Sequence, residues 1–311
     1  MKILLLDKNH PLITEQLSEK GFVLEEDFSS SYEQVLDKIH LYEGIIIRSR
    51  IPLDAHFLEK AKNLKFIARV GAGMENIDIA KAQELGIKLI NSPEGNKDAV
   101  AEHVIGTLLV LMNRLFISSN EVKKGIWLRE ENRGEEILGK TFGIIGYGNM
   151  GKAVAKRLSG FGCKTIFYDI KPNLSDEFAT QVSLQELQEN ADILSLHTPL
   201  TEDTLYMIDE EFISKMKKNF YFINTARGKN LKTSALVNAL KSDKVKGACL
   251  DVLEYEKTSF ENLETKNEDL EYLLNSEKAI ITPHIAGWTH ESKIKLAQVI
   301  VDKILAFTAR N

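Results

Sequence analysis

Cysteine is scarce in this chain of 311 residues, which contains only Cys163 and Cys249. Two cysteines cannot make a disulfide framework, and neither has metal-ligand spacing, so no metal site is predicted. The chain also lacks a basic block and carries a net charge of −5, which argues against nucleic-acid and anionic-membrane partners. Only four apolar residues precede Asp7, too few for a signal peptide, and no later apolar run approaches the roughly 20 residues of a membrane span. We therefore expect a cytoplasmic protein.

The composition is otherwise that of a globular protein, with 43% hydrophobic and 27% charged residues over a length typical of two domains. Short apolar runs alternate with helical patterns, which is typical of parallel sheets with helical crossovers. Residues 98–114 form a helical pattern with almost no polar face, as expected at a domain or subunit junction. Residues 254–278 form a long charged insertion. In the first hundred residues the predicted strands are 2–7, 22–25, 44–47, 64–70 and 87–90, and the predicted helices are 11–20, 32–40 and 78–85.

A glycine-rich turn follows an apolar strand near the middle of the chain. Gly146, Gly148 and Gly151 form a G-x-G-x-x-G pattern that opens a helical stretch. In a dinucleotide site these glycines permit a tight turn, close approach to the pyrophosphate and close helix packing, and the helix N-terminus binds the anion. The next strand ends at Asp169, 18 residues after Gly151, at the spacing of the carboxylate that binds the adenosine ribose. The pattern predicts NAD as cofactor, and Lys171 leaves NADP as the alternative.

Three later apolar segments are followed by a reactive side chain, Arg227, Glu256 or His284. Because the carboxyl ends of strands in a doubly wound sheet converge on the ligand site, we expect these side chains to lie close together. Hydride transfer to a carbonyl builds charge on oxygen, which a histidine can protonate and an arginine can stabilise. Glu256 beside His284 would favour the imidazolium, and Glu254 is the weaker candidate for that role. Taken singly, each of these residues would be structural or part of a surface ion pair.

In this order, these motifs resemble the D-isomer-specific 2-hydroxyacid dehydrogenases over nearly the whole chain. The resemblance implies an α/β fold of two doubly wound parallel-sheet domains. A flavodoxin-like substrate-binding domain would comprise residues 1–97 and 288–311, and a Rossmann NAD-binding domain would comprise residues 98–287. The catalytic residues would be Arg227, Glu256 and His284. The other segments that carry the resemblance are 69–73, 76–78, 91–93, 101–103, 196–201, 224–228, 251–256 and 283–287.

The resemblance also implies how cofactor, substrate and partner subunit are bound. The backbone N–H groups of Gly71, Ala72 and Gly73 would bind the substrate carboxylate in a nest-like arrangement. A homodimer is implied, with 98–114 and 120–139 in the interface; the alternative is that 98–114 is buried only between domains. The implied NAD contacts are Gly146, Gly148, Asn149, Met150, Gly151, Asp169, His197, Thr198, Pro199, Thr225, Ala226, Asp251 (on the nicotinamide amide) and Gly287.

Within the family, the sequence is most similar to the D-3-phosphoglycerate dehydrogenases, which oxidise 3-phospho-D-glycerate to 3-phosphohydroxypyruvate in serine biosynthesis. Arg48 and Arg69 match positions that bind the substrate phosphate in those enzymes, and Arg129 matches a segment that reaches the partner subunit's site. A cluster of arginines suits a dianionic phosphate. The alternative is that Arg48 and Arg129 are ordinary surface arginines.

The sequence departs from the family pattern near Glu256. Lys257 stands where the family usually has proline, and the insertion after it is long. A regulatory C-terminal domain is not expected, because the chain ends 27 residues after His284. Two other functions stay open: a hydroxypyruvate or glyoxylate reductase, and an NAD-sensing, corepressor-like interaction protein on the same scaffold. Formate oxidation is less favoured, because formate enzymes of this group pair the histidine with glutamine rather than with a glutamate such as Glu256.

Overall fold

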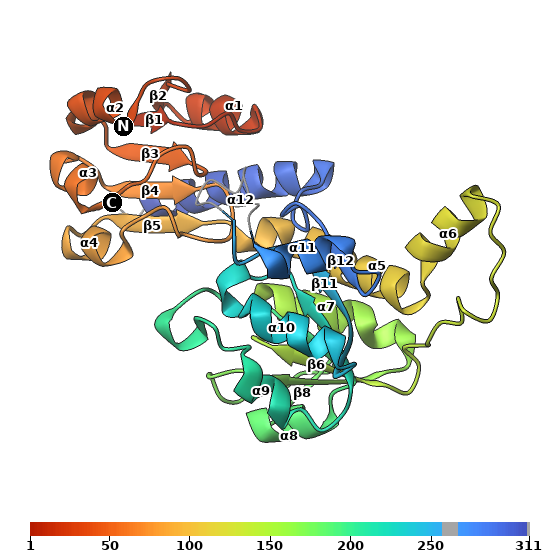
Figure 1. Ribbon diagram of the computed structural model, residues 1–311. Coiled ribbons are helices and arrows are strands. Elements are labelled where there is room, and N and C mark those ends of the chain that lie inside the picture. Colours follow the sequence, from red (N-terminus) through yellow and green to blue (C-terminus); the bar gives the residue numbers. More distant parts are fainter. Residues whose placement is uncertain (257–266, 310–311) are drawn as a thin grey trace. The chain divides into compact units, whose positions relative to one another are not determined.

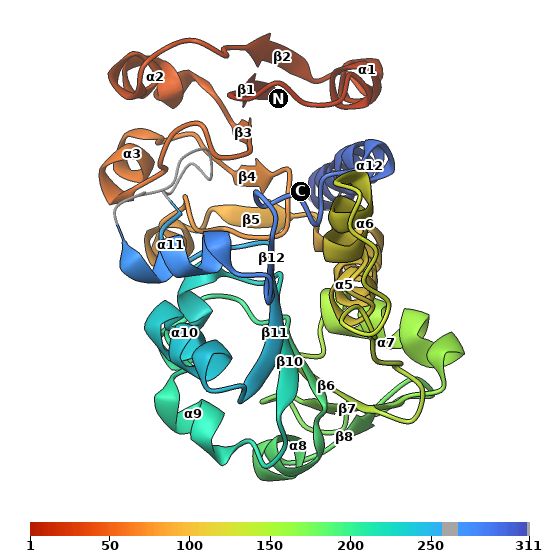
Figure 2. The same cartoon turned by 45° about the vertical axis from the view of Figure 1, so that its right-hand side comes forward.

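The computed structural model describes residues 1–256 and 267–309 of the chain (Figures 1 and 2). The chain divides into two compact units, one formed by residues 1–97 with 288–311 and the other by residues 98–287. They are called unit 1 and unit 2 below. Lys257 and residues 258–266 of the predicted insertion lie outside the described residues.

Unit 1 contains a five-stranded parallel sheet in the order β2-β1-β3-β4-β5, the order of flavodoxin-like folds. Helices α1 and α12 cover one face, and α2, α3 and α4 cover the other (Figure 2). Because both faces are covered, β1 is apolar on both sides: Ile3 and Leu5 face one core, and Leu4 faces the other. The elements are β1 (Lys2–Leu5), α1 (Leu12–Glu19), β2 (Val23–Glu26), α2 (Tyr32–Lys38), η1 (Ile39–Leu41), β3 (Gly44–Ile47), α3 (Ala55–Lys60), β4 (Phe66–Arg69), α4 (Ile79–Glu84), β5 (Lys88–Asn91) and α12 (His290–Thr308).

Unit 2 contains a seven-stranded parallel sheet in the order β12-β11-β10-β9-β6-β7-β8. Helices α5 and α7 cover one face, and α8 to α11 cover the other (Figure 2). The direction of winding reverses between β6 and β9, and doubly wound sheets bind ligands at the carboxyl ends of strands at such a switch point. The elements are α6 (Leu115–Lys123), β6 (Thr141–Ile145), α7 (Asn149–Leu158), η2 (Ser159–Phe161), β7 (Lys164–Tyr168), β8 (Thr180–Gln181), α8 (Leu184–Asn190), β9 (Ile193–Leu196), η3 (Glu202–Thr204), α9 (Glu210–Lys215), β10 (Phe220–Asn224), η4 (Gly228–Asn230), α10 (Thr233–Lys241), β11 (Val245–Leu250), α11 (Glu268–Asn275) and β12 (Ala279–Ile281).

The predicted α/β class with two doubly wound parallel sheets is confirmed, but the predicted start of the long helix is wrong. Helix α5 (Pro93–Met112) begins in unit 1, five residues before the predicted position, and runs into unit 2. Proline suits the first turn of a helix, where its missing N–H costs no hydrogen bond. The predicted helix also ends too late, because Arg114 takes a left-handed conformation between α5 and α6.

No single helix within residues 1–256 and 267–309 is long and apolar enough to span a membrane. Helices α5 and α6, which meet at a bend, together have the length and apolar composition of a span. In the part of the chain that the structure describes, no group of three or more His, Cys, Asp and Glu side chains is placed to hold a metal ion.

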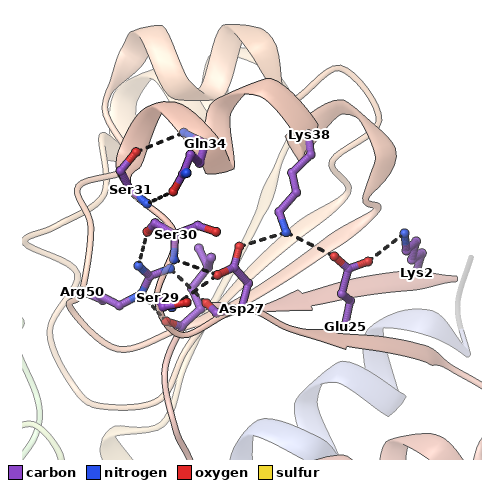
Figure 3. A network of polar contacts seen from close by, with 10 residues as sticks. Lys2, Glu25, Asp27, Ser29, Ser30, Ser31, Gln34, Lys38 and Arg50 are labelled. Carbon is purple, nitrogen blue, oxygen red and sulfur yellow. Dashed lines mark hydrogen bonds and ion pairs between the residues drawn. The ribbon is translucent and has the colours of Figure 1, made fainter.

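In unit 1, Arg50 joins the loop after β3 to the loop after β2 (Figure 3). Its Nε donates to the Leu6 carbonyl at 2.5 Å, Nη1 to the Ser30 carbonyl at 2.5 Å and Nη2 to the Asp27 carbonyl at 3.0 Å. Asp27 also forms an ion pair with Lys38 at 2.9 Å. Although burial opposes it, the hydrogen bond from Lys38 lowers the pKa of Asp27 well below its usual range. Arg50 therefore has a structural role, satisfying three backbone carbonyls.

We predict that Arg50→Met lowers the free energy of unfolding by about 2–4 kcal/mol, because three partly buried carbonyls lose a charged donor. Urea denaturation measures the effect. Arg133→Met is the matched control, since the Arg133 side chain is exposed and forms a surface ion pair with Glu130; its effect should stay within about 0.5 kcal/mol. Equal effects of the two substitutions would contradict the structural role of Arg50.

Candidate active site

The glycine turn between β6 and α7 has the geometry of an anion site. Gly146 has a φ of +91°, and a Cβ there would lie 2.7 Å from the His197 carbonyl oxygen. A Cβ on Gly151 would lie 2.2 Å from the Gly146 carbonyl oxygen, so α7 could not approach the turn. Gly148 is exposed and caps α7 without a side chain, and a Cβ there would meet no atom within 4 Å. The first turn of α7 thus presents its N–H groups to an open face.

Asp169, directly after β7, is held in a fixed orientation beside this turn. Its Oδ2 accepts a hydrogen bond from the Tyr147 backbone N–H at 2.7 Å, and its Oδ1 accepts one from the Lys171 N–H at 2.9 Å. The ring of Tyr147 stacks on Phe167 with 3.7 Å between ring centroids, and its hydroxyl donates to Asp176 at 2.8 Å. Tyr147 therefore joins the glycine turn to the acidic loop after β7, and the Asp169 carboxylate is placed as an acceptor next to the turn.

Two buried polar atoms at neighbouring strand ends lack a hydrogen-bond partner within the described residues: His197 Nδ1 after β9 and Thr225 Oγ1 after β10. Such orphaned atoms are uncommon inside proteins. The other ring nitrogen of His197 lies 2.9 Å from Ser195 Oγ, and burial lowers the pKa of His197 to about 3, so the ring is neutral. Together with the open helix end and the oriented Asp169, these atoms fit a bound dinucleotide.

Glu256 and His284 are in direct contact. Glu256 Oε2 lies 2.8 Å from His284 Nδ1, and Oε1 accepts a hydrogen bond from the Leu253 N–H. His284 has a φ of 55°, a conformation that non-glycine residues rarely adopt. Its backbone N–H donates to the carbonyls of Asp251 at 2.8 Å and Thr282 at 3.0 Å, which hold it there. An uncommon backbone conformation at a paired histidine is typical of a functional site.

The loop that carries His284 is fixed by the buried carboxylate of Asp251. This carboxylate accepts hydrogen bonds from the Thr282 hydroxyl at 2.6 Å and from the N–H groups of Ile285 and Ala286, each at 2.8 Å. His103 on α5 lies 3.1 Å from the Thr282 hydroxyl. Both oxygens of Asp251, which we expected to contact NAD, are therefore engaged in shaping the His284 loop.

Arg227 follows β10 in a loop shaped by two buried asparagines. The side chain of Asn224 donates to the Arg227 carbonyl at 2.9 Å, and the Arg227 N–H donates to Asn230 at 3.1 Å. A Cβ on Gly228 would lie 1.9 Å from the Leu253 carbonyl oxygen. The Arg227 loop thus packs directly against the turn that holds Glu256.

Glu254, the weaker candidate for the histidine's partner, has another role. Its Oε2 accepts a hydrogen bond from the N–H of Thr233, the first residue of α10, at 2.9 Å. A carboxylate at a helix N-terminus is stabilised by the unpaired N–H groups and the helix dipole. The alternative that Glu254 is the partner of His284 is therefore wrong, and Glu256 takes that position.

In unit 1, Arg48 and Arg69 are neighbours at the ends of β3 and β4. The Nε of Arg69 donates to the Arg48 carbonyl at 3.1 Å, and its Nη1 would lie 2.0 Å from a Cβ on Gly71. The Gly71 N–H already donates to Ser92 Oγ at 3.1 Å and to the Arg69 carbonyl at 2.9 Å. Because the Gly71 N–H is engaged in this way, the predicted binding of the substrate carboxylate would use the backbone N–H groups of Ala72 and Gly73. Arg129 lies exposed in the segment after α6 of unit 2.

Residues 105–286 match the family model described as "D-isomer specific 2-hydroxyacid dehydrogenase, NAD binding domain". The chain belongs to this family. It is thus a member of a family of NAD-dependent oxidoreductases that act on small 2-hydroxy and 2-oxo acids, and its recognition from the sequence motifs is confirmed.

Named relatives within the family differ in substrate. The chain is 38% identical over 272 residues to hydroxypyruvate reductase of Thermotoga maritima, covering 88% of this chain and 87% of the relative. It is 34% identical over 310 residues to D-3-phosphoglycerate dehydrogenase of Archaeoglobus fulgidus, covering 98% of this chain but 57% of that relative. The crystal structure of D-lactate dehydrogenase from Aquifex aeolicus, complexed with NAD and lactic acid, is similar with a TM-score of 0.85 and 30% identity, covering 99% of this chain and 96% of that one.

Sequence reasoning missed several residues that build the site: Tyr147, Asn224, Asn230 and Thr282. Each is a polar or aromatic residue inside or near a motif, and each forms hydrogen bonds that shape its own loop or join it to a neighbouring one. For Tyr147, Asn224 and Thr282 the available signal was their position at strand ends, where a side chain has backbone groups of a loop within reach.

We predict that Gly151→Ala weakens NAD binding about tenfold or more, because the added methyl group would force α7 away from the glycine turn. Titration of NADH fluorescence measures the dissociation constant. Gly160→Ala is the matched control: a Cβ there meets nothing within 4 Å, so affinity should be unchanged. Unchanged affinity in Gly151→Ala would contradict the assignment of this turn to the cofactor.

Proposed function

We propose that this chain is an NAD-dependent dehydrogenase that oxidises a D-2-hydroxy acid bearing a second anionic group, namely 3-phospho-D-glycerate, to 3-phosphohydroxypyruvate. The observation that carries the substrate assignment is the adjacent pair Arg48 and Arg69. Two arginines suit a phosphate dianion because each can donate two parallel hydrogen bonds. The reaction would serve serine biosynthesis, and a cytoplasmic location stays a prediction.

NAD, when bound, supplies the hydride acceptor. The glycine turn and the first turn of α7 would bind its pyrophosphate, and the Asp169 carboxylate would accept hydrogen bonds from its ribose. A carboxylate there repels the additional phosphate of NADP, which favours NAD. The other residues proposed to line the cofactor are Asn149, Met150, His197, Thr198, Pro199, Thr225, Ala226 and Gly287, whereas Asp251 is proposed to hold the His284 loop.

His284 would accept the proton of the substrate hydroxyl at Nε2 during oxidation and return it during reduction. Glu256 supports this role because it binds Nδ1, fixes the orientation of the ring and stabilises the imidazolium that forms. Arg227 would stabilise the charge that develops on the substrate oxygen. Ala72 and Gly73 would bind the substrate carboxylate through backbone N–H groups.

A hydroxypyruvate or glyoxylate reductase is the second candidate. The 38% identity to the Thermotoga hydroxypyruvate reductase favours it. The same Glu256–His284 pair would serve that reaction in the reducing direction, so the two candidates differ in what Arg48 and Arg69 bind.

The test is a panel of substrates: 3-phosphoglycerate and D-glycerate in oxidation, hydroxypyruvate and glyoxylate in reduction. We expect the highest kcat/KM in each direction for the phosphorylated acid, with 3-phosphohydroxypyruvate added in reduction. Arg48→Ala should raise KM about tenfold or more for the phosphorylated acids alone, because only they carry the second anion. His284→Gln should lower kcat by about 10²–10⁴ on every substrate.

Preference for the unphosphorylated acids, or an equal effect of Arg48→Ala on all substrates, would overturn the phosphate assignment and support the reductase. Turnover unaffected by His284→Gln would contradict the catalytic assignment itself.

We also propose a homodimer formed through α6 and the segment after it. Six apolar side chains within residues 115–128 are exposed by 41–75%, and exposed apolar side chains that gather on one segment commonly mark a protein interface. The arm is held together by Asn132, which donates to Glu121 and to the Leu128 carbonyl. The exposed side chains are Leu115, Phe116, Val122, Ile126, Trp127 and Leu128.

Size-exclusion chromatography with light scattering tests this proposal. We expect the mass of a dimer for the natural chain and of a monomer for the double variant Phe116→Asp, Trp127→Asp, since two buried carboxylates would face an apolar partner. Ile170→Asp is the control, because Ile170 is 85% exposed but lies outside the arm. A monomeric natural chain would contradict the proposal.

A further inference from the structure

Three arginines lie at the ends of β3 and β4 in unit 1, and only two of them are candidates for binding an anion. The guanidinium of Arg50 donates to three backbone carbonyls (Figure 3), so its role is structural. Arg69 uses its Nε on the Arg48 carbonyl. The guanidinium of Arg48 lies over the ring of Trp288.

The position of Arg48 is fixed at both its backbone and its side chain. Its N–H donates to Asp7 Oδ2 at 2.6 Å, and its carbonyl accepts the bond from Arg69. Its guanidinium carbon lies 4.4 Å from the centroid of the Trp288 ring, within the range of a cation–π interaction. A long side chain that would otherwise sample many rotamers is thereby held in one region.

Trp288 has no evident structural reason to be aromatic. It is 65% exposed and directly precedes Thr289, the N-cap of α12. An apolar residue at this position commonly packs against the fourth residue of the helix, but here that residue is Lys293, which offers no apolar partner of the usual kind. Thr289 already caps the helix with Ser292. The contact with Arg48 therefore accounts for the indole better than helix capping does.

We propose that Trp288 is a positioning residue that presents Arg48 to the phosphate of the substrate and thereby sets the preference for a phosphorylated over an unphosphorylated 2-hydroxy acid. This inference rests on the proposed function. Stacking uses the face of the guanidinium, whereas hydrogen bonds to a phosphate use its edge, so one arginine can do both. If the guanidinium of Arg48 is already held in place before the substrate binds, less side-chain rotamer entropy is lost on binding.

The first test compares Trp288→Ala with Trp288→Phe on two substrates that differ only in the phosphate, 3-phosphoglycerate and D-glycerate. We expect Trp288→Ala to raise KM for 3-phosphoglycerate about 3- to 10-fold, with kcat and the kinetics of D-glycerate unchanged. Trp288→Phe, which keeps an aromatic face, should restore most of the loss. Ile294→Ala removes an exposed apolar side chain from the same helix and is the control that should change neither substrate. Equal effects on both substrates, or none, would overturn the inference.

The second test separates this inference from the proposed substrate. The chain has two tryptophans, so Trp127→Phe leaves Trp288 as the sole tryptophan reporter. We expect inorganic phosphate to change Trp288 emission saturably, and Arg48→Met to abolish the response. A phosphate response without turnover of 3-phosphoglycerate supports the role of Trp288 while overturning the proposed substrate. Turnover of 3-phosphoglycerate with no emission response and no effect of Trp288→Ala overturns the role of Trp288 and leaves the proposed function standing.

Discussion

The buried carboxylate of Asp251 accepts three hydrogen bonds from the loop that carries His284, two from backbone N–H groups and one from Thr282. Those bonds compensate for the uncommon left-handed backbone of His284, whose φ is 55°. With the loop held in this form, the His284 ring meets Glu256 at 2.8 Å. The candidate proton-transfer pair therefore depends on a buried acidic residue that directly follows the neighbouring strand β11.

The same principle recurs at the other loops of unit 2. Asn224 and Asn230 hold the Arg227 loop, and Tyr147 joins the glycine turn to Asp169. The side chains of Asn224, Asn230 and Asp169 thereby satisfy backbone groups of the loops that follow the strands. The residues proposed to act on substrate and cofactor are thus positioned by neighbours that would touch neither.

The fold and much of the site could be predicted from the sequence, because the signals are local. Strands that are apolar on both faces predict covered parallel sheets, and the glycine pattern with Asp169 predicts the cofactor turn. Other features depend on contacts between distant segments. Glu254 and Glu256 are two residues apart in similar surroundings, and only the packed loops show that Glu254 caps α10 while Glu256 meets His284. The stacking of Trp288 on Arg48 joins residues 240 positions apart, so no local pattern could predict it.

The central claim is that Asp251 places His284 for proton transfer. The most direct test is Asp251→Asn, which keeps the shape of the side chain but replaces one acceptor oxygen with an NH2 group. Because that group cannot accept a hydrogen bond, the N–H of either Ile285 or Ala286 loses its acceptor. We predict that kcat falls by about 10²-fold or more while the dissociation constant of NADH, measured by fluorescence, changes less than about threefold. A weakened affinity for NADH with kcat retained at saturating cofactor would contradict this account and assign Asp251 to the cofactor instead.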